Sequence, residues 1–231
     1  MAQTSEIKVL SSLAIREAYL ELVPEFEKTS GYRVVTTWTG TVDIRKRMAA
    51  GEVYDLVIMT RDGIAALTGE GKIVPGSGVD LVKVGIGIAV REGAAKPDVS
   101  SPAALKAALL AAKTIGYSTG PSGVYLQGLF ERMGIGSQVK DKVRTVPSGE
   151  VIGDAIVRGD VEIGFQQVSE LVHFPGTAFL GPLPAEIQHI SVFAGGIHTA
   201  AENPAGAKAL IAHLTSAAAV PAIRSHGLEP G

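Results

Sequence analysis

The sequence predicts an α/β protein of two lobes, and two features of the chain lead to this prediction. Short apolar segments alternate with segments of helical periodicity, which is typical of a parallel sheet covered by helices. Two longer apolar segments, Val82 to Arg91 and Ile187 to Ala194, flank the middle of the chain. We interpret them as strands that cross between the lobes, because a long strand suits such a crossing. The predicted first lobe comprises residues 1–82 and 192–231, and the second lobe residues 83–191.

The composition excludes several classes of function. The chain has 231 residues, of which 46% are hydrophobic and 19% charged, so it can bury a sizeable core. It has no cysteine, which excludes thiol catalysis and thiolate metal sites. The formal net charge is −2 and the basic residues are scattered, so nucleic-acid binding is not predicted. The 5 histidines match no metal motif and no nucleotide fingerprint continues, so we expect neither a metal nor a cofactor.

Three strands are predicted in the first lobe, each followed by small, hydroxyl or charged residues. The strands are Ile7 to Leu10, Arg33 to Thr37 and Asp55 to Met59. The residues that follow them are Ser11 and Ser12, then Thr39, Gly40 and Thr41, and then Arg61. Helical patterns separate the strands, and the first helix is expected to end at Gly31. Because ligands of open α/β sheets bind at the carboxyl ends of strands, we expect these residues to face a ligand.

The stretch from Gly116 to Met133 predicts a strand end, a loop of small and hydroxyl residues, and a helix. Ser118, Ser122 and Gly123 lie in the loop, and Ser122 is predicted as the N-cap. The free N–H groups and the positive end of the helix dipole would both face the loop. The sequence therefore predicts an anion site here, although an ordinary capped helix has the same pattern.

The other loops also have two interpretations. Ser11 and Ser12 suit either an anion or the cap of the following helix, and Thr39 to Thr41 suit either an anion or a plain turn. Arg61 either clamps a carboxylate, or pairs with Asp62 or faces solvent. A second-lobe strand, Ile163 to Phe165, is followed directly by Gln166 and Gln167, and at least one of these amides should reach a ligand.

The order of these segments resembles the periplasmic molybdate-binding proteins, which belong to the type II periplasmic binding proteins of ABC transporters. The segments that carry the resemblance are Val9 to Ser12, Pro24 to Gly31, Ile44 to Gly51, Tyr54 to Ile58, Gly116 to Tyr125, Val146 to Val151 and Gly159 to Gln167. The resemblance covers nearly the whole chain. It implies two α/β lobes joined by two crossing strands, with an oxyanion held in a cleft between them.

The resemblance also implies which groups hold the anion. Hydroxyl side chains would come from the loop at Ser11 and Ser12 and from the loop at Thr39, and backbone N–H groups from Ser122 and Val151. Thr39, Ser122 and Val151 match the pattern of the family, whereas Ser11 and Ser12 only lie close to the position of its first serine.

Three other positions depart from the family. Ala14 stands where a serine is usual, and Gln167 where a tyrosine often contributes its hydroxyl. Arg61 stands where a small or acidic residue is frequent. An arginine and paired amides suit planar carboxylates better than tetrahedral metal oxyanions. The resulting hypothesis is a receptor for a small organic carboxylate, with molybdate or tungstate as an alternative ligand.

A second group of relatives adds an enzymatic alternative. The aconitate isomerases resemble proteins of the molybdate-binding type, and they move a double bond and a proton between trans- and cis-aconitate without a cofactor. Such an enzyme needs a general base with a pKa tuned towards neutrality. The candidates in this chain are Glu150, Glu170 and His173. Receptor and isomerase share the physics of the pocket, so the sequence leaves both open.

The start of the chain bears on its compartment. Residues Met1 to Ser5 contain no signal peptide, and a polar Ala-Gln start suits a mature exported chain. We therefore expect a periplasmic location, with the cytoplasm as the alternative. The expected partners are a small anion and, for a receptor, the permease of an ABC transporter, and we expect a monomer.

Overall fold

The computed structural model describes residues 5–231, and in it the chain divides into two compact units. Unit 1 comprises the residues up to Lys83 together with Val192–Gly231, and unit 2 comprises Val84–Ser191. The chain therefore passes from one unit to the other twice. This division differs from the predicted one by a single residue, at position 83.

Unit 1 is built on a six-stranded sheet with the strand order β11-β4-β10-β3-β1-β2. Its strands are β1 (Glu6–Ser12), β2 (Arg33–Thr39), β3 (Leu56–Thr60), β4 (Val79–Val84), β10 (Ser191–Ile197) and β11 (Glu229–Pro230). β1 pairs in parallel with both β2 and β3, whereas β10 is antiparallel to β3. The carboxyl ends of β1, β2 and β3 consequently lie at one edge of the sheet.

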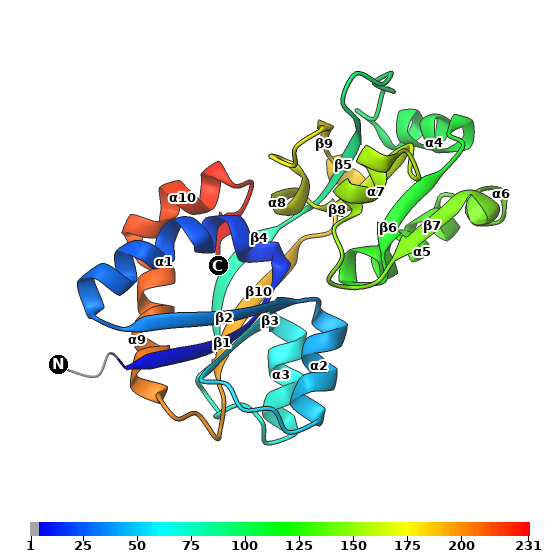
Figure 1. The fold of residues 1–231 in the computed structure, drawn as a ribbon. Coiled ribbons are helices and arrows are strands. Elements are labelled where there is room, and N and C mark those ends of the chain that lie inside the picture. Colours follow the sequence, from blue (N-terminus) through cyan, green and yellow to red (C-terminus); the bar gives the residue numbers. More distant parts are fainter. Residues whose placement is uncertain (1–4) are drawn as a thin grey trace. The chain divides into compact units, whose positions relative to one another are not determined.

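The helices of unit 1 cover both faces of its sheet (Figure 1). They are α1 (Arg16–Ser30), α2 (Thr41–Ala49), α3 (Arg61–Gly69), α9 (Pro204–Leu214) and α10 (Val220–Ser225), with 3-10 turns at Leu13–Ile15 and Ala217–Ala219. β1 lies between β2 and β3, so right-handed crossovers place α1 and α2 on opposite faces. Ile44 and Met48 of α2 are fully buried against Leu10 and Val57 of the sheet. As predicted, Gly31 ends α1 in a left-handed conformation.

Unit 2 contains a five-stranded sheet with the order β7-β6-β8-β5-β9. Its strands are β5 (Ile86–Arg91), β6 (Ile115–Ser118), β7 (Val143–Val146), β8 (Ile163–Gln167) and β9 (Thr177–Pro182). Its helices are α4 (Pro102–Ala111), α5 (Pro121–Arg132), α6 (Gly136–Val139), α7 (Ile152–Arg158) and α8 (Val168–Leu171), with 3-10 turns at Lys140–Lys142 and Ala185–Ile187. β6 is parallel to β7 and β8, and β5 is antiparallel to β8.

The two faces of this sheet are packed differently. Leu126, Phe130 and other apolar side chains of α4, α5 and α6 form the larger core with Phe165. On the opposite face Gly116 and Gly164 lie under α7 and its flanks. A Cβ at Gly116 would lie 2.5 Å from Val161. The glycines that alternate with aliphatic residues in these strands therefore allow α7 to approach the sheet closely.

Two sequence-based expectations about strands were wrong, and one strand was missed. The predicted strand Val82 to Arg91 is broken at Gly85, because β4 and β5 belong to different sheets. The strand predicted from Ile187 begins only at Ser191, since the Gln188 side chain accepts from the Ile86 N–H and donates to its carbonyl, at 2.8 and 3.0 Å. β9 was not predicted at all, and its six residues show no apolar alternation.

No single helix between residues 5 and 231 is long and apolar enough to cross a membrane. The bent pair formed by α9 and residues 217–225 has the length and composition of a span, and those two properties alone.

Candidate functional site

The hydroxyl residues of unit 1 are brought together by the pairing of β1 with β2. Ser12 is the register partner of Thr39, and Ser11 that of Trp38. Both serines are buried. The Ser11 hydroxyl donates to the Ser12 carbonyl at 3.2 Å, and the Ser12 Oγ accepts from the Ala14 N–H at 3.3 Å. Ser12 thus caps the short turn that follows β1, which is the structural role considered for it from the sequence.

Thr39, Gly40 and Thr41 lead directly into α2, and an internal acid occupies this helix start. Asp43 lies in the first turn of α2 and accepts from the Thr39 hydroxyl at 2.9 Å and from Arg47 Nε at 3.1 Å. These donors, the Thr39 hydroxyl first, hold the pKa of Asp43 below its ordinary value. The Thr39 hydrogen is therefore directed to Asp43, whose negative charge disfavours a second anion at the same place.

Arg61 is the first residue of α3, directly after β3 as expected. Its Nε donates to Asp80 Oδ1 at 2.9 Å, and its Nη2 donates to Asp80 Oδ2. The predicted pairing with Asp62 was wrong, because the partner of Arg61 is Asp80. A carboxylate ligand would have to compete with Asp80 for this guanidinium.

The loop between β6 and α5 has the geometry of an anion site. The predicted N-cap, Ser122, is the second residue of the helix, and Gly120 is the N-cap instead. Pro121 has no N–H, and helix geometry leaves the N–H groups of Ser122 and Gly123 without an intrahelical acceptor. A Cβ at Gly123 would lie 1.7 Å from the Ser118 carbonyl oxygen, so only glycine allows this approach. The first turn contains no acidic residue.

A second loop lies against this one. The Ser148 N–H donates to Thr119 Oγ1 at 3.0 Å, and the Thr119 N–H donates to the Val146 carbonyl at 2.9 Å. Thr119 therefore joins the ends of β6 and β7. The sequence analysis selected Ser118 and Ser122 and missed Thr119. Its hydroxyl directly after the end of a strand could have indicated it.

Gln166 holds the start of α7 in place. Its Oε1 accepts from the Ile152 N–H at 2.6 Å, and its Nε2 donates to the Glu150 carbonyl at 3.2 Å. Val151 is the N-cap of α7 without a side-chain cap bond. Both ends of the Gln166 amide are engaged, and the Ile152 N–H at the start of α7 already has an acceptor. Gln166 therefore positions the loop that leads into α7.

Gln167 differs from its neighbour. Its side chain is buried, with 3% of its surface exposed. Its Nε2 donates to Ser191 Oγ at 3.3 Å, and its Oε1 has no hydrogen-bond partner among the described residues. A buried polar atom without a partner costs free energy, which makes it a candidate contact for a ligand.

The three candidate bases occupy different environments. Glu150 and His173 are exposed, whereas Glu170 is partly buried in α8. Burial raises the pKa of Glu170 to about 7, against hydrogen bonds from the Gln167 N–H and the Gln166 side chain that lower it. Glu170 is therefore the candidate whose charge changes near neutral pH, and it lies beside both glutamines.

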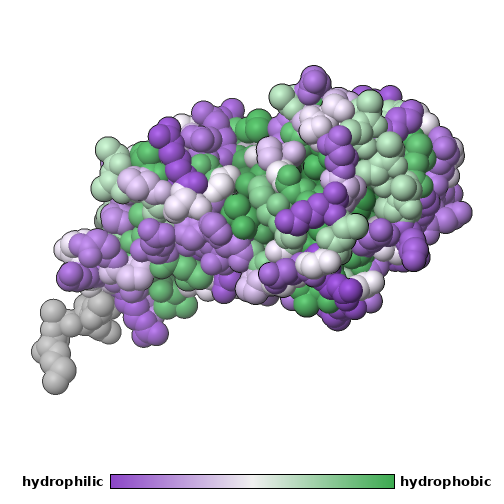
Figure 2. Space-filling view, turned by 90° about the horizontal axis from the view of Figure 1, so that it is seen from above, coloured by the Kyte–Doolittle hydropathy of each residue, from purple (hydrophilic) through white to green (hydrophobic). Residues whose placement is uncertain are grey.

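One exposed apolar side chain stands at the start of α5. Val124, in the first turn of α5, is 68% exposed. Hydrophilic and hydrophobic side chains are interspersed on the face of the molecule shown in Figure 2. Because no charged side chain occupies the first turn of α5, backbone N–H groups are the source of positive potential there.

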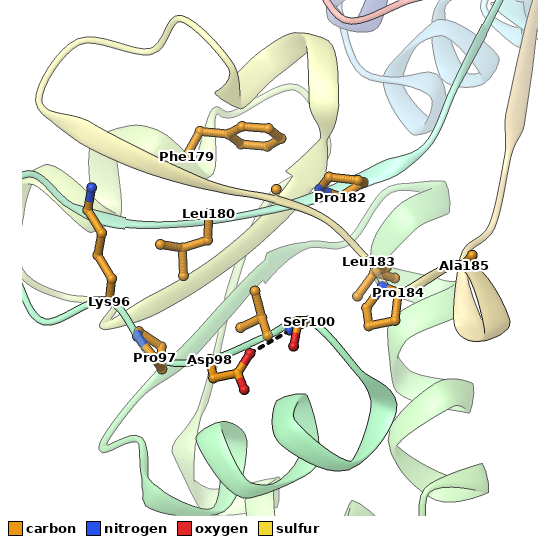
Figure 3. Close-up of a pocket in the computed structure, with 12 residues that line it drawn as sticks. Lys96, Pro97, Asp98, Ser100, Phe179, Leu180, Pro182, Leu183, Pro184 and Ala185 are labelled. Carbon is orange, nitrogen blue, oxygen red and sulfur yellow. Dashed lines mark hydrogen bonds between the residues drawn. The ribbon is translucent and has the colours of Figure 1, made fainter.

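A separate pocket in unit 2 does not involve the predicted residues. It has a volume of about 550 Å³ and lies between residues 96–100 and residues 179–185. Apolar side chains such as Phe179 and Leu180 line it together with Lys96 (Figure 3). Asp98 accepts from the Ser100 N–H at 2.9 Å, which keeps the pKa of its carboxyl low. A carboxylate that stays charged makes this pocket a poor anion site. Elsewhere in residues 5–231, no three His, Asp or Glu side chains gather as metal ligands.

Comparison with known proteins gives this geometry a context. The profile of the family described as bacterial extracellular solute-binding protein matches residues 7–229. An aconitate isomerase from Pseudomonas sp. is 35% identical over 230 residues, covering 97% of this chain and 87% of the isomerase.

Solved structures share the fold at lower identity. The periplasmic molybdate-binding protein of Azotobacter vinelandii aligns with a TM-score of 0.81 and 18% identity over 97% of this chain and 99% of its own. The sulfate-binding protein of Mycobacterium tuberculosis aligns with a TM-score of 0.78 and 15% identity, over 98% and 87%. These findings confirm the predicted type II periplasmic-binding-protein fold and the resemblance to molybdate-binding proteins and aconitate isomerases. The chain belongs to the family of bacterial extracellular solute-binding proteins.

Proposed function

We propose that this protein binds a small organic polycarboxylate and isomerises it in the manner of an aconitate isomerase. The observation that carries the proposal is Glu170, a partly buried carboxyl with a pKa of about 7 beside Gln166 and Gln167. A pure anion receptor gains nothing from such a group, whereas an enzyme that transfers a proton at neutral pH requires one. The 35% identity to an aconitate isomerase supports the same reading.

The start of α5 supports the choice of an anion as ligand. The N–H groups of Ser122 and Gly123 and the positive end of a 12-residue helix are available to one carboxylate of the substrate. The resemblance assigns further donors to the loops at Ser12 and Thr39, although the Thr39 hydroxyl must first leave Asp43.

The reaction needs one proton acceptor and no redox change. The ionised Glu170 removes a proton from the methylene carbon next to the double bond, and one C–H bond breaks. The electron pair is delocalised over the allylic carbons and the adjacent carboxylate. A proton then returns to the other end of the allylic system, so that the double bond has moved and atoms and charge balance. Because the base must be ionised, kcat should rise with pH through about 7.

The test is the variant Glu170→Gln, which keeps the shape of the side chain and cannot accept the proton. Isomerisation of trans-aconitate is followed by ultraviolet absorbance, and binding by calorimetry. We expect kcat to fall by about 100-fold or more, with affinity changed only a few-fold. Glu150→Gln, at an exposed position, should retain the activity. Full activity of Glu170→Gln would overturn the assignment of the base.

The second candidate function is a receptor that binds without turnover, and the family description favours it. In that case the protein would work in the periplasm and deliver a carboxylate, or molybdate or tungstate, to the permease of an ABC transporter. Tight binding of trans-aconitate by the wild-type protein with no change in absorbance would favour this candidate. If only molybdate raised the melting temperature, the ligand would be a metal oxyanion and not a carboxylate.

A further inference from the structure

We propose that unit 2 has a second ligand site, between α5, α6 and the edge strand β7, and that this site binds a zwitterionic dipeptide. These three elements line a pocket of about 510 Å³, a volume in the range of small-molecule sites (Figure 1). None of the residues that line it belongs to residues 118–123, and Glu170 is not among them. The inference therefore goes beyond the proposed isomerase and does not depend on it.

The most buried polar side chain of this pocket is Tyr117, and its hydroxyl has no partner. Only 8% of Tyr117 is exposed, and its ring packs edge-on against that of Phe130 in α5, with ring centroids 6.1 Å apart. The hydroxyl makes no hydrogen bond with residues 5–231, and burial alone raises the pKa of the phenol. Phe130 is 2% exposed, so neither ring offers a face on which a sugar or a base could stack. What Tyr117 offers a ligand is a hydroxyl that can donate and accept.

Two side chains of opposite charge line the same pocket, and no ion pair in the described part of the chain neutralises them. They are Glu131 of α5 and Lys140, which follows α6, and both are exposed. Since they form no ion pair with each other, their charged atoms lie more than 4.0 Å apart. The Glu131 carboxylate lies directly against the backbone of Gly136, where a Cβ would overlap it. The pocket thus offers one negative and one positive group at separate places.

This arrangement favours a zwitterion as the ligand. Its ammonium would meet Glu131, and its carboxylate would meet Lys140. A free amino acid carries both charges on one carbon, whereas a dipeptide separates them by a peptide bond, which suits charges more than 4.0 Å apart. The peptide bond also provides one donor and one acceptor for the Tyr117 hydroxyl and the exposed Gln127 amide.

The first test measures binding of L-alanyl-L-alanine to the wild-type chain by calorimetry. We expect saturable binding of one dipeptide. N-acetyl-alanyl-alanine lacks the ammonium and alanyl-alanine amide lacks the carboxylate, so each should bind about 10-fold more weakly or worse. No saturable binding of alanyl-alanine up to about 10 mM, or equal binding of the two blocked peptides, would overturn the proposal.

The second test assigns the binding to this pocket. Tyr117→Phe removes the hydroxyl and keeps the packed ring, so it should weaken alanyl-alanine binding about 3- to 10-fold. Glu131→Gln should weaken it about 10-fold or more, and should not change the affinity for the N-acetyl peptide, which has no ammonium. Glu92→Gln, at an exposed position of the same unit, is the matched control and should bind as the wild type does. Undiminished binding in either pocket variant would overturn the proposal.

Competition with tricarballylate separates this site from the proposed active site. Tricarballylate is a saturated tricarboxylate with no double bond to isomerise, so it serves as the probe for the start of α5. Alanyl-alanine should bind equally well to Glu170→Gln and at saturating tricarballylate. Competitive displacement by tricarballylate would place the dipeptide at the start of α5 and overturn the second site. If the wild type binds alanyl-alanine and no tricarballylate, only the proposed function fails.

Discussion

The start of α2 in unit 1 and the start of α5 in unit 2 look alike in sequence and differ in chemistry. Both follow a strand directly and have a glycine as N-cap, Gly40 and Gly120. The first turn of α2 contains Asp43, which accepts from Thr39 and Arg47, whereas the first turn of α5 contains no acid. The comparison indicates that an internal carboxylate can occupy, at such a helix start, the place that a bound anion would otherwise take.

Asp43 of unit 1 and Glu170 of unit 2 have pKa values shifted in opposite directions. Donors from Thr39 and Arg47 lower the pKa of Asp43, while burial raises the pKa of Glu170 to about 7. Asp43 is therefore charged at neutral pH and acts as a built-in anion. Glu170 is ionised only in part, so it can exchange a proton with a bound substrate. In unit 1 an acid of the chain thus lies at the start of α2, whereas in unit 2 the first turn of α5 has none.

The largest expected effect comes from filling the close approach at the start of α5. In Gly123→Ala the new methyl group would overlap the Ser118 carbonyl, so the start of the helix must move. We expect loss of tricarballylate binding and a free energy of unfolding lower by about 2–4 kcal/mol, measured by urea denaturation.

A control for this substitution exists on the same helix. At Gly128 a Cβ would meet only the flexible end of Arg132, at 3.2 Å. Gly128→Ala should therefore keep the ligand and stabilise the protein by about 0.5–1 kcal/mol. If Gly123→Ala bound as well as Gly128→Ala, the start of α5 would not be the anion site.

The pH dependence of stability should separate the two acids. The folded protein binds the proton of Glu170 more tightly than the unfolded chain does, because its folded pKa of about 7 exceeds the ordinary 4.5. Its contribution is full below pH 4.5 and is lost as the pH rises through about 7. Glu170→Gln should flatten the stability curve in this window, measured by melting temperature from pH 4 to 8.

Asp43 should act in the opposite direction and in a different window. Its pKa is depressed from 3.8, so its contribution is present above that value and is lost only as the pH falls further. Asp43→Asn should therefore leave the curve between pH 5 and 8 unchanged. A change in that range caused by Asp43→Asn, or none caused by Glu170→Gln, would contradict the contrast between the two acids.

Asp43→Asn should also make the start of α2 more like that of α5. Removing the built-in charge is expected to strengthen tricarballylate binding about 3-fold, while the neutral amide still accepts from the Thr39 hydroxyl and only the ion pair with Arg47 is lost. Asp62→Asn is the matched control, since Asp62 lies in the first turn of α3. Calorimetry at low salt measures both variants, and an equal gain in the control would assign the effect to net charge.

The smallest effect is expected from Asp80→Asn, which releases Arg61 from its exposed ion pair. Such pairs contribute little, so the urea denaturation midpoint should not change measurably. If Arg61 then reaches the ligand, tricarballylate affinity rises about 2-fold. Arg158 pairs with Asp160 in a similar exposed way, and Asp160→Asn is the control that should leave affinity unchanged.

Sequence reasoning predicted the alternation of strands and helices and the loops that carry polar residues. It failed where a side chain far along the chain changed the local structure, as Gln188 does at Ile86. It also placed the N-cap at Ser122, since a hydroxyl is the usual cap, whereas Pro121 makes Gly120 the last residue before the helix. The candidate residues could be chosen from the sequence because their residue types carry the chemistry. Their hydrogen-bond partners and pKa values could not be predicted, because these depend on residues far away in the chain.

By itself the sequence determined the α/β order of this protein, its family and the loops in which polar residues follow strands, because periodicity and residue type are local properties. Only the tertiary structure decided which of these residues remain available. Arg61 meets Asp80 across 19 positions of the chain, and Gln167 meets Ser191 across 24. Hydrogen bonds between residues this far apart depend on how strands pair, and pairing follows from burying the core as a whole.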